Sequence, residues 1–237
     1  MANVTRETPV LVALAARALE FVTNDTIVGL GTGRAATAFV HALGERVRGG
    51  LRVRGVPTSE ATATLARNHG IPLLSLEEVD QIDVTVDGAD EVDPQLDLIK
   101  GYGGALVREK VVAAASRTEI IVVGSEKLVT VLGQRGILPV EVLPFALGLC
   151  KRRLAAAGCQ PKVRCVEGRP FLSDNGNYIV DCGVEPLRRP RELENAIRAI
   201  PGVVGTGLFL GMAGVVLVGQ TDGTVREFRQ PMSPENR

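Results

Sequence analysis

The chain has 237 residues, with 27 basic and 27 acidic side chains, so its formal net charge at pH 7 is zero. This length predicts one or two domains with a core that needs no disulfide or metal ion for stability. Apolar residues at 45% and charged residues at 23% exclude a disordered, collagen-like or coiled-coil protein. The zero net charge and 3% aromatic content give no indication of binding to nucleic acid or to an anionic membrane.

The first half of the chain alternates between helical and strand patterns. Thr8-Pro9 can cap a first helix, and Thr58-Ser59 can cap a later one. Helical periodicity covers residues 11–22, 35–47, 60–69 and 105–116. Apolar, β-branched runs predict strands at residues 26–30, 51–56, 82–90 and 119–123. This alternation predicts a parallel sheet with both faces covered, in which ligands bind at the carboxyl ends of the strands.

The pattern changes from about residue 133. Strands are predicted at 138–142, 161–166 and 203–209, and a further strand follows an Asn-Gly turn within residues 173–183; helices are predicted at 145–158 and 191–200. The order β-α-β-β-α-β is typical of a ferredoxin-like unit. A hairpin at 213–228 is expected to return to the first sheet. We therefore predict a larger α/β domain of residues 1–132 and 204–237, with an inserted ferredoxin-like α+β domain of residues 133–203.

The cysteines and histidines show no spacing typical of a zinc site or a disulfide framework; they are Cys150, Cys159, Cys165, Cys182, His41 and His69. A reducing cytoplasm is the simplest expectation. Near the N-terminus, Glu7 and several arginines interrupt the apolar positions, which is unlike a secretory signal. The longest apolar stretches are far shorter than the roughly 20 residues of a membrane span.

The first segment with chemical potential is GLGTGRAA, residues 29–36, between a predicted strand and helix. Backbone N–H groups of such a loop, together with the helix N-terminus, favour a phosphate. A dinucleotide fingerprint would need glycine where Arg34 stands and an acidic residue about twenty positions later. The segment also lacks the GK[ST] of a P-loop, and a tight turn without a ligand is the alternative.

The second segment is DGADEVDPQLDLIKGYGGALVREK, residues 87–110. Asp87 and Asp90 stand at a predicted strand end, Lys100 precedes a glycine-rich loop, and Glu109 falls in the first turns of a predicted helix. Proton transfer next to a carbonyl needs a carboxylate base and donors for the enediolate oxygen. The alternatives are that these acids cap a turn or a helix N-terminus, or bind a hard cation, although calcium-loop spacing is missing.

Five motifs, in order and spacing, resemble the type A ribose-5-phosphate isomerase family: DGADEVD, LIKGYGGALVREKVVA, LPVEVLPFA, SDNGNYIVD and PGVVGTGLF. The resemblance covers nearly the whole chain. It implies reversible conversion of D-ribose 5-phosphate to D-ribulose 5-phosphate, a step of the non-oxidative pentose phosphate pathway, without a metal or organic cofactor. It also implies a Rossmann-like domain with an inserted ferredoxin-like domain, in a cytoplasmic homodimer or larger homo-oligomer.

The resemblance further implies roles for individual residues. Glu109 corresponds to the proton acceptor and Lys100 to the lysine near the developing oxyanion, while Asp87 and Asp90 hold sugar hydroxyls and assist ring opening. Substrate-binding positions fall in the neighbouring loops: Thr32, Gly33, Arg34, Ala35, Gly88, Ala89, Gly101, Tyr102, Gly103 and Lys127.

Three loops depart from the family pattern. GTGRA stands where GTGST is usual, so Arg34 and Ala35 replace two hydroxyl donors. Tyr102 replaces the second of four glycines, which would be strained if that position needed a positive φ. Residues 124–126 read GSE where D-x-S is usual. These departures leave two alternatives open: a sugar-phosphate sensor with little turnover, or an isomerase of another sugar phosphate.

Overall fold

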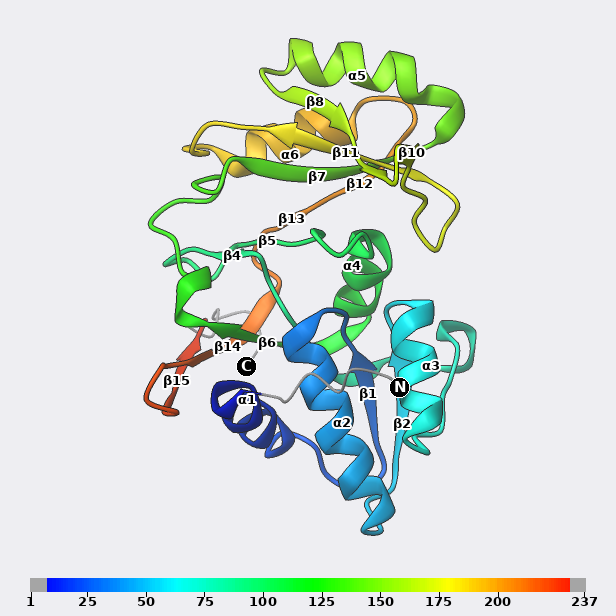
Figure 1. The fold of residues 1–237 in the computed structure, drawn as a ribbon, viewed down its shortest axis with the longest axis vertical. Helices are drawn as coiled ribbons and strands as arrows, with labels where there is room; N and C mark the ends of the chain where they lie inside the picture. Colours follow the sequence, from blue (N-terminus) through cyan, green and yellow to red (C-terminus); the bar gives the residue numbers. More distant parts are fainter. Residues whose placement is uncertain (1–7, 231–237) are drawn as a thin grey trace. The chain divides into compact units, whose positions relative to one another are not determined.

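The computed structural model describes residues 8–230 of the chain. The chain forms two compact units, shown together in Figure 1. The first unit contains Met1–Gly88, Val112–Glu126 and Ala213–Arg237, and the second contains Ala89–Val111 and Lys127–Met212. The chain therefore leaves the first unit twice and returns to it twice. The division into residues 1–132 with 204–237 and residues 133–203 stays a prediction.

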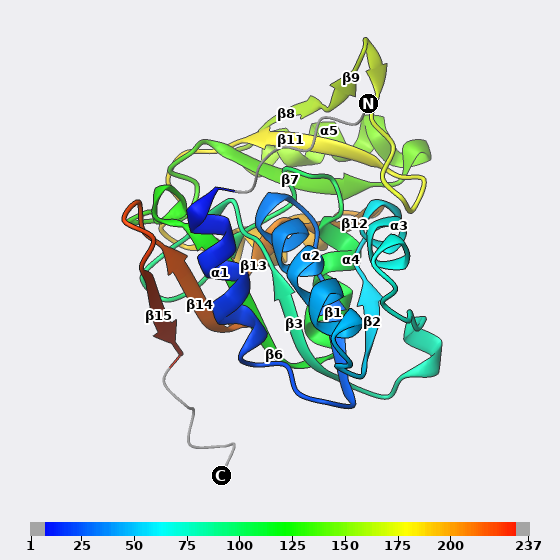
Figure 2. The ribbon, with the colours of Figure 1, turned by 60° about the horizontal axis from the view of Figure 1, so that its bottom comes forward.

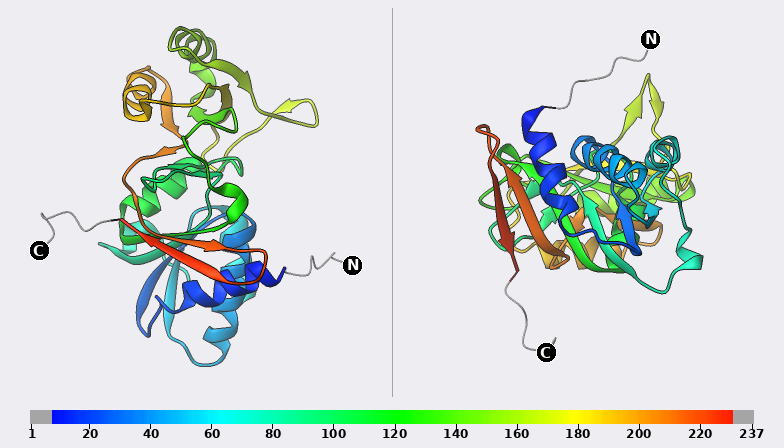
Figure 3. Two further views of the ribbon diagram at one scale, coloured as in Figure 1. Left: turned by 90° about the vertical axis from the view of Figure 1, so that its left-hand side faces the viewer. Right: turned by 90° about the horizontal axis from the view of Figure 1, so that it is seen from below.

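The first unit is built on a six-stranded sheet with the order β15-β14-β6-β3-β1-β2. Its strands are β1 (Thr26–Leu30), β2 (Val53–Pro57), β3 (Ile82–Asp87), β6 (Ser116–Gly124), β14 (Ala213–Gly219) and β15 (Val225–Arg229). All neighbouring pairs are parallel except β14 with β15, which form the antiparallel edge seen in Figure 3. The central parallel sheet and the returning hairpin are confirmed.

Three helices cover one face of this sheet and lie in one layer in Figure 2. They are α1 (Pro9–Leu19), α2 (Arg34–Arg48) and α3 (Glu60–Asn68). Their apolar residues pack with alternate residues of the strands, such as Val28 and Leu30 of β1, in one buried cluster. Ser59 caps α3 by accepting a hydrogen bond from the Thr62 N–H, as predicted. Thr8 occupies the cap position of α1, but its side chain makes no capping bond.

The second unit contains an antiparallel four-stranded sheet with the order β12-β7-β11-β8. Its elements in chain order are β7 (Ile137–Val142), α5 (Leu147–Ala156), β8 (Gln160–Val163), β11 (Tyr178–Gly183), α6 (Pro190–Arg198) and β12 (Val203–Thr206). Both helices pack on the face formed by Leu138, Val140, Val180 and Cys182. The opposite face of this sheet carries polar residues, including Glu141 and Asp181, and these become important for the site.

Several short elements have too few residues to give a sequence pattern. They are the strands β4 (Glu91–Val92), β5 (Leu98–Ile99), β9 (Cys165–Val166), β10 (Arg169–Pro170) and β13 (Leu208–Phe209), and the 3-10 helices Leu76–Glu78, Ser125–Lys127 and Pro144–Ala146. Helix α4 (Leu106–Ala114) follows β5 in the chain. None of the helices within residues 8–230 is long and apolar enough to cross a membrane.

The predicted strand at residues 203–209 is wrong as a single element. The chain pairs with β7 up to Thr206 and then with β5 from Leu208, so β12 and β13 belong to different sheets. The break is at Gly207, where an added Cβ would lie 2.2 Å from the Lys100 carbonyl oxygen. The Gly207 N–H donates to Pro139, and its carbonyl accepts from the Lys100 N–H at 2.9 Å. A glycine therefore joins the two sheets beside Lys100.

Candidate functional site

In the first unit, the loop after β1 and the last residue of β3 meet at the carboxyl edge of the parallel sheet. Asp87 is fully buried, and its Oδ1 accepts hydrogen bonds from the Thr32 N–H at 3.0 Å and the Gly88 N–H at 2.7 Å. A Cβ added at Gly31 would lie 2.3 Å from this oxygen, so only glycine allows the approach. The predicted strand at residues 82–90 ends at Asp87, because the Gly88 N–H turns back to the side chain of Asp87.

Sequence reasoning missed a cluster of hydroxyl groups around Thr32. Thr32 Oγ1 lies 2.8 Å from Thr58 Oγ1, 2.9 Å from Ser59 Oγ and 3.2 Å from Thr62 Oγ1. Thr62 Oγ1 also donates to the Gly31 carbonyl at 3.0 Å, which fixes the loop after β1. The available signal was the run of hydroxyl residues directly after β2, because parallel neighbours end at the same edge.

The N-terminus of α2 lies at this edge. Gly33 is the N-cap residue of α2, and its φ of 101° favours glycine. No side-chain hydrogen bond caps this end of the helix. Arg34 is the first helical residue and is exposed, whereas Ala35 is partly buried. The first-turn N–H groups of this 15-residue helix therefore stand beside the Gly31–Gly33 loop with the polarity that favours an anion.

In the second unit, Lys100 and Glu109 form a buried ion pair. Lys100 Nζ lies 3.5 Å from Glu109 Oε2, and both side chains are at most 5% exposed. Lys100 follows β5, and Glu109 lies in the first turns of α4. The Phe209 ring lies under the ammonium, with its centroid 5.3 Å from Nζ. A carboxylate and an ammonium are thus held together away from bulk water, as proton transfer beside a carbonyl requires.

Asp90 links two further predicted residues within the second unit. Its Oδ1 lies 3.7 Å from Lys127 Nζ, and its Oδ2 accepts a hydrogen bond from the Tyr102 N–H at 2.9 Å. Burial raises the pKa of Asp90 above its ordinary value of 3.8, and the Tyr102 N–H and the Lys127 charge oppose this shift only in part. Burial, with the Asp90 charge, also raises the pKa of Tyr102 to about 12.

The loop after Lys100 has glycine at the positions where its backbone adopts a positive φ. Gly101 and Gly104 have φ of 104° and 85°, and Gly103 is exposed. Within residues 8–230, the non-glycine residues with positive φ are Asp25, Leu96 and Glu167. Tyr102 therefore carries no such strain, and the family departure at this position is tolerated by the backbone.

An arginine that sequence reasoning missed holds this loop. Arg164 Nη1 donates to the carbonyls of Gly101 and Tyr102, each at 3.0 Å, and its other nitrogens bind the Asp181 carboxylate at 2.5 and 3.0 Å. Arg164 and Asp181 come from the second half of the chain, and no spacing pattern connects them with residues 101 and 102.

We expect the raised pKa of Asp90 to appear in the pH dependence of stability. A carboxyl whose pKa is higher in the folded state stabilises the fold below its unfolded-state pKa, and this contribution is lost as the pH rises through the folded value. Asp90→Asn removes this titration, so its stability relative to the parent should increase as the pH rises from about 3.8 towards 7. Urea unfolding of both proteins across this range measures the difference; a constant difference, or one that falls with pH, would contradict the burial effect.

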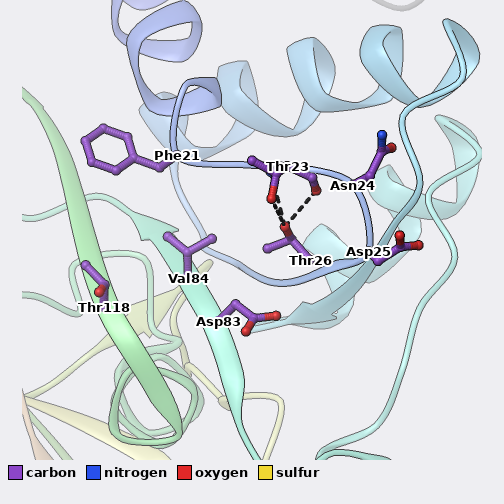
Figure 4. Close-up of a pocket in the computed structure, with 8 residues that line it drawn as sticks. All are labelled: Phe21, Thr23, Asn24, Asp25, Thr26, Asp83, Val84 and Thr118. Carbon is purple, nitrogen blue, oxygen red and sulfur yellow. Dashed lines mark hydrogen bonds between the residues drawn. The ribbon is translucent and has the colours of Figure 1, made fainter.

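A cavity of about 360 Å³ lies elsewhere in the first unit, at the amino ends of β1, β3 and β6 (Figure 4). Its lining includes Thr23, Thr26, Asp83 and Thr118, and the Thr23–Thr26 hydrogen bonds close the turn that forms one wall. None of the sequence-predicted site residues lines it. Within residues 8–230, no group of three or more His, Cys, Asp or Glu side chains is arranged to hold a metal ion.

Comparisons with known proteins show the family of this chain. The family model for ribose 5-phosphate isomerase A (phosphoriboisomerase A) matches residues 54–223. The ribose-5-phosphate isomerase A of Gloeobacter violaceus is 53% identical over 210 residues, covering 88% of this chain and 91% of that protein. The protein of the same name from Roseiflexus castenholzii is 49% identical over 214 residues, covering 89% and 92%.

Solved structures give the same result. The ribose 5-phosphate isomerase from Plasmodium falciparum has a TM-score of 0.91 and 38% identity, covering 95% of this chain and 100% of that one. A D-ribose-5-phosphate isomerase solved in complex with phospho-erythronic acid has a TM-score of 0.89 and 39% identity, covering 93% and 97%. A family match across most of the chain, near-complete relatives at about half identity and the shared fold lead to one conclusion: this chain belongs to the ribose 5-phosphate isomerase A family and is an isomerase.

Proposed function

We propose that this protein interconverts D-ribose 5-phosphate and D-ribulose 5-phosphate through an enediolate, with Glu109 as the base. The buried Lys100–Glu109 pair is the observation that carries the assignment, because it supplies a carboxylate and a positive charge within 3.5 Å of one another. Family membership supports the choice of substrate. The relative solved with phospho-erythronic acid supports a phosphorylated, polyhydroxylated ligand.

The reaction moves one proton between adjacent carbons. In the open-chain aldose, Glu109 takes the proton from C2, and the electron pair of that C–H bond forms the C1–C2 double bond of the enediolate. The negative charge develops on the former carbonyl oxygen, where the Lys100 ammonium stabilises it. The proton of the C2 hydroxyl passes to the anionic C1 oxygen, and Glu109 returns a proton to C1. The electron pair left on the C2 oxygen forms the new carbonyl, so the ketose forms without net oxidation.

We assign the binding of the sugar hydroxyls and ring opening to Asp87 and Asp90. The two residues are separated in the chain only by Gly88 and Ala89, whose backbone groups are then available to the same sugar. Asp87 receives two backbone N–H groups and Asp90 a third, which support fixed carboxylates. Lys127, beside Asp90, and the loop of Gly101, Tyr102 and Gly103 are assigned to substrate binding.

The phosphate is assigned to Thr32, Gly33 and the first turn of α2. The exposed Arg34 side chain and the N–H of Ala35 stand at this helix start, where Arg34 takes the place of a hydroxyl donor. A guanidinium suits a phosphate, because its planar fork donates two hydrogen bonds at once.

Arg34→Ala is therefore expected to weaken the binding of ribose 5-phosphate by roughly 10- to 100-fold, since a charge-assisted contact contributes about 1.5–3 kcal/mol. Binding of unphosphorylated ribose should change by less than about threefold. Calorimetric titration with both ligands measures the two effects. Arg46→Ala, at the exposed far end of the same helix, is the matched control. Equal and small effects of Arg34→Ala on both ligands would assign the phosphate to Thr32, the loop backbone and Lys127.

The enzyme is expected to need no metal ion, since an ammonium and backbone donors supply the charge stabilisation. Prolonged treatment with EDTA should leave kcat/KM within about twofold of its starting value. If activity is lost and a divalent cation restores it, the acids between residues 87 and 97 would have to be assigned as a coordination site.

The loop departures favour one alternative within the same chemistry: an isomerase of another aldose phosphate. Arg34 and Tyr102 are the residues that would change substrate choice. Ketose formation from ribose 5-phosphate, compared with other pentose and hexose phosphates, tests the assignment. The proposal expects ribose 5-phosphate to have the highest kcat/KM. A higher value for another aldose phosphate would change the substrate, and tight binding with no turnover on any of them would indicate a sensor.

We also infer a Rossmann-like catalytic domain with a ferredoxin-like insertion, in a cytoplasmic homodimer or larger homo-oligomer. The sheet order β12-β7-β11-β8 and the chain order β-α-β-β-α-β support the ferredoxin-like assignment. The oligomer and the cytoplasm rest on the family resemblance, and the cytoplasm also on the cysteines, which form no disulfide in the described part of the chain.

A further inference from the structure

Glu109 stands between two charged neighbours on α4, Arg108 and Lys110, and both are anchored within the second unit. Arg108 Nε donates to Asn175 Oδ1 at 2.9 Å, and Arg108 Nη2 donates to the Asp174 carbonyl at 2.9 Å. Lys110 Nζ donates to the Leu208 carbonyl at 2.7 Å. The first turns of α4 are therefore fixed by a contact on each side of the residue assigned as the base.

The Arg108 anchor is the turn between residues 173 and 177, and it is tightly built. The Ser173 N–H donates to the Asn177 carbonyl, and the Gly176 N–H donates to the Ser173 carbonyl, both at 2.9 Å. Gly176 has a φ of 74°, which favours glycine. The anchor is thus a closed turn, on which Asn175 is exposed.

A buried carboxylate lies behind this turn. Oε1 of Glu141 accepts hydrogen bonds from Asn175 Nδ2 at 3.0 Å, Asn177 Nδ2 at 2.8 Å and Ser173 Oγ at 2.9 Å. Asn175 therefore bridges two groups: its amide nitrogen donates to Glu141 and its amide oxygen accepts from Arg108. A negative charge on the donor side of an amide polarises it and strengthens the bond that its oxygen accepts.

The hydrogen bonds of the turn do not require a negative charge at Glu141. Glu141 is fully buried, and its Oε2 has no hydrogen-bond partner among the described residues. Burying an ionised carboxylate with one oxygen unsatisfied costs free energy. A glutamine at this position could accept the same three hydrogen bonds without that charge. Glu141 therefore contacts Asn175 directly and can act on Arg108 only through Asn175.

We propose that Glu141 and Asn175 act through Arg108 as positioning residues for Glu109. This inference rests on the proposed role of Glu109 as the base. Proton transfer between carbons needs the carboxylate in a near-attack geometry, and a misplacement of about 1 Å can lower the rate by about 10²-fold. Arg108 holds the first turns of α4, Asn175 orients the guanidinium, and Glu141 orients Asn175.

The test compares Arg108→Ala, Asn175→Ala and the double variant with the parent protein. Each single variant should lower kcat by about 10- to 50-fold and leave KM within about threefold, because the substrate contacts remain. The double variant should lose no more than about twice what the single variants lose, because both substitutions break the same chain of contacts. Glu141→Gln, which keeps the turn, should lose about two- to fivefold in kcat, and Arg108→Lys should recover part of the Arg108→Ala loss. Arg153→Ala, an exposed arginine on α5, is the matched control and should behave like the parent.

Hydrogen exchange of the α4 amides provides a readout that does not depend on the reaction. In Arg108→Ala and Asn175→Ala these amides should exchange about tenfold faster or more, while those of α5 and α6 stay unchanged. Unchanged kcat and unchanged α4 exchange would overturn the proposal, as would losses that multiply in the double variant. If the variants have a lower free energy of unfolding but an unchanged kcat, the network contributes to folding alone, and the proposal is wrong. If the parent protein fails to isomerise ribose 5-phosphate, the proposed function fails, and α4 exchange still decides whether the anchor exists.

Discussion

Replacing Glu109 by glutamine is expected to lower kcat for ribose 5-phosphate by about 10²–10⁴-fold, with a smaller change in KM. Glutamine has nearly the same shape and can still bind the substrate, but it cannot take a proton from carbon. The loss therefore reports general base catalysis. Steady-state kinetics of the purified variant, followed through ketose formation, measures it.

The control for this substitution is another acid in the first turn of a helix. Glu192 lies in the first turn of α6, and it is exposed. Glu192→Gln should keep kcat within about twofold of the parent value, because a solvated side chain contributes little. A Glu109→Gln protein with near-normal kcat would show that another group accepts the proton.

Replacing Lys100 by methionine should lower kcat by about 10²–10³-fold and leave KM within a few-fold, since its ammonium stabilises charge that develops only in the transition state. Methionine fills most of the same space beside the Phe209 ring, so the change removes the charge with little loss of packing. Kinetic constants measured over a range of substrate concentrations separate the two effects. If only KM changes, Lys100 binds the ground state and the transition-state role is wrong.

Stability must be measured beside these constants, because Lys100 and Glu109 are both buried. Breaking a buried ion pair by removing one partner costs about 3–5 kcal/mol, whereas removing both charges costs much less. The double variant Lys100→Met with Glu109→Gln should therefore be more stable than Lys100→Met alone, while remaining inactive. This comparison separates the loss of catalysis from the loss of folded protein.

Much of the first unit could be predicted because its strands are buried on both faces. Continuous apolar runs such as TIVGL in β1 and IIVV in β6 predict buried strands directly. The three-stranded sheet of β4, β5 and β13 gave no such signal, since each strand has only two residues. Its position depends on the glycine break at Gly207, which is a tertiary contact with Lys100 and leaves no local pattern.

The proximity of the two central candidate residues could be predicted from the local sequence. Lys100 and Glu109 are nine residues apart in one motif, and the structure brings them to 3.5 Å. The residues that hold the site come from distant segments: Arg164 fixes the loop after Lys100, and Asn175 fixes Arg108. Their contacts depend on the packing of the second unit, so the sequence offered only an Asn-Gly turn and an unremarkable arginine.

The central claim is that Glu109 carries the proton between C2 and C1 of the sugar. Incubating the protein with ribose 5-phosphate in deuterated water, and following deuterium by NMR, tests this most directly. The parent protein should form ribulose 5-phosphate with solvent deuterium at C1, and Glu109→Gln should slow both ketose formation and deuterium incorporation by at least about 10²-fold. Ketose formation and deuterium incorporation at parent rates in Glu109→Gln would contradict the account.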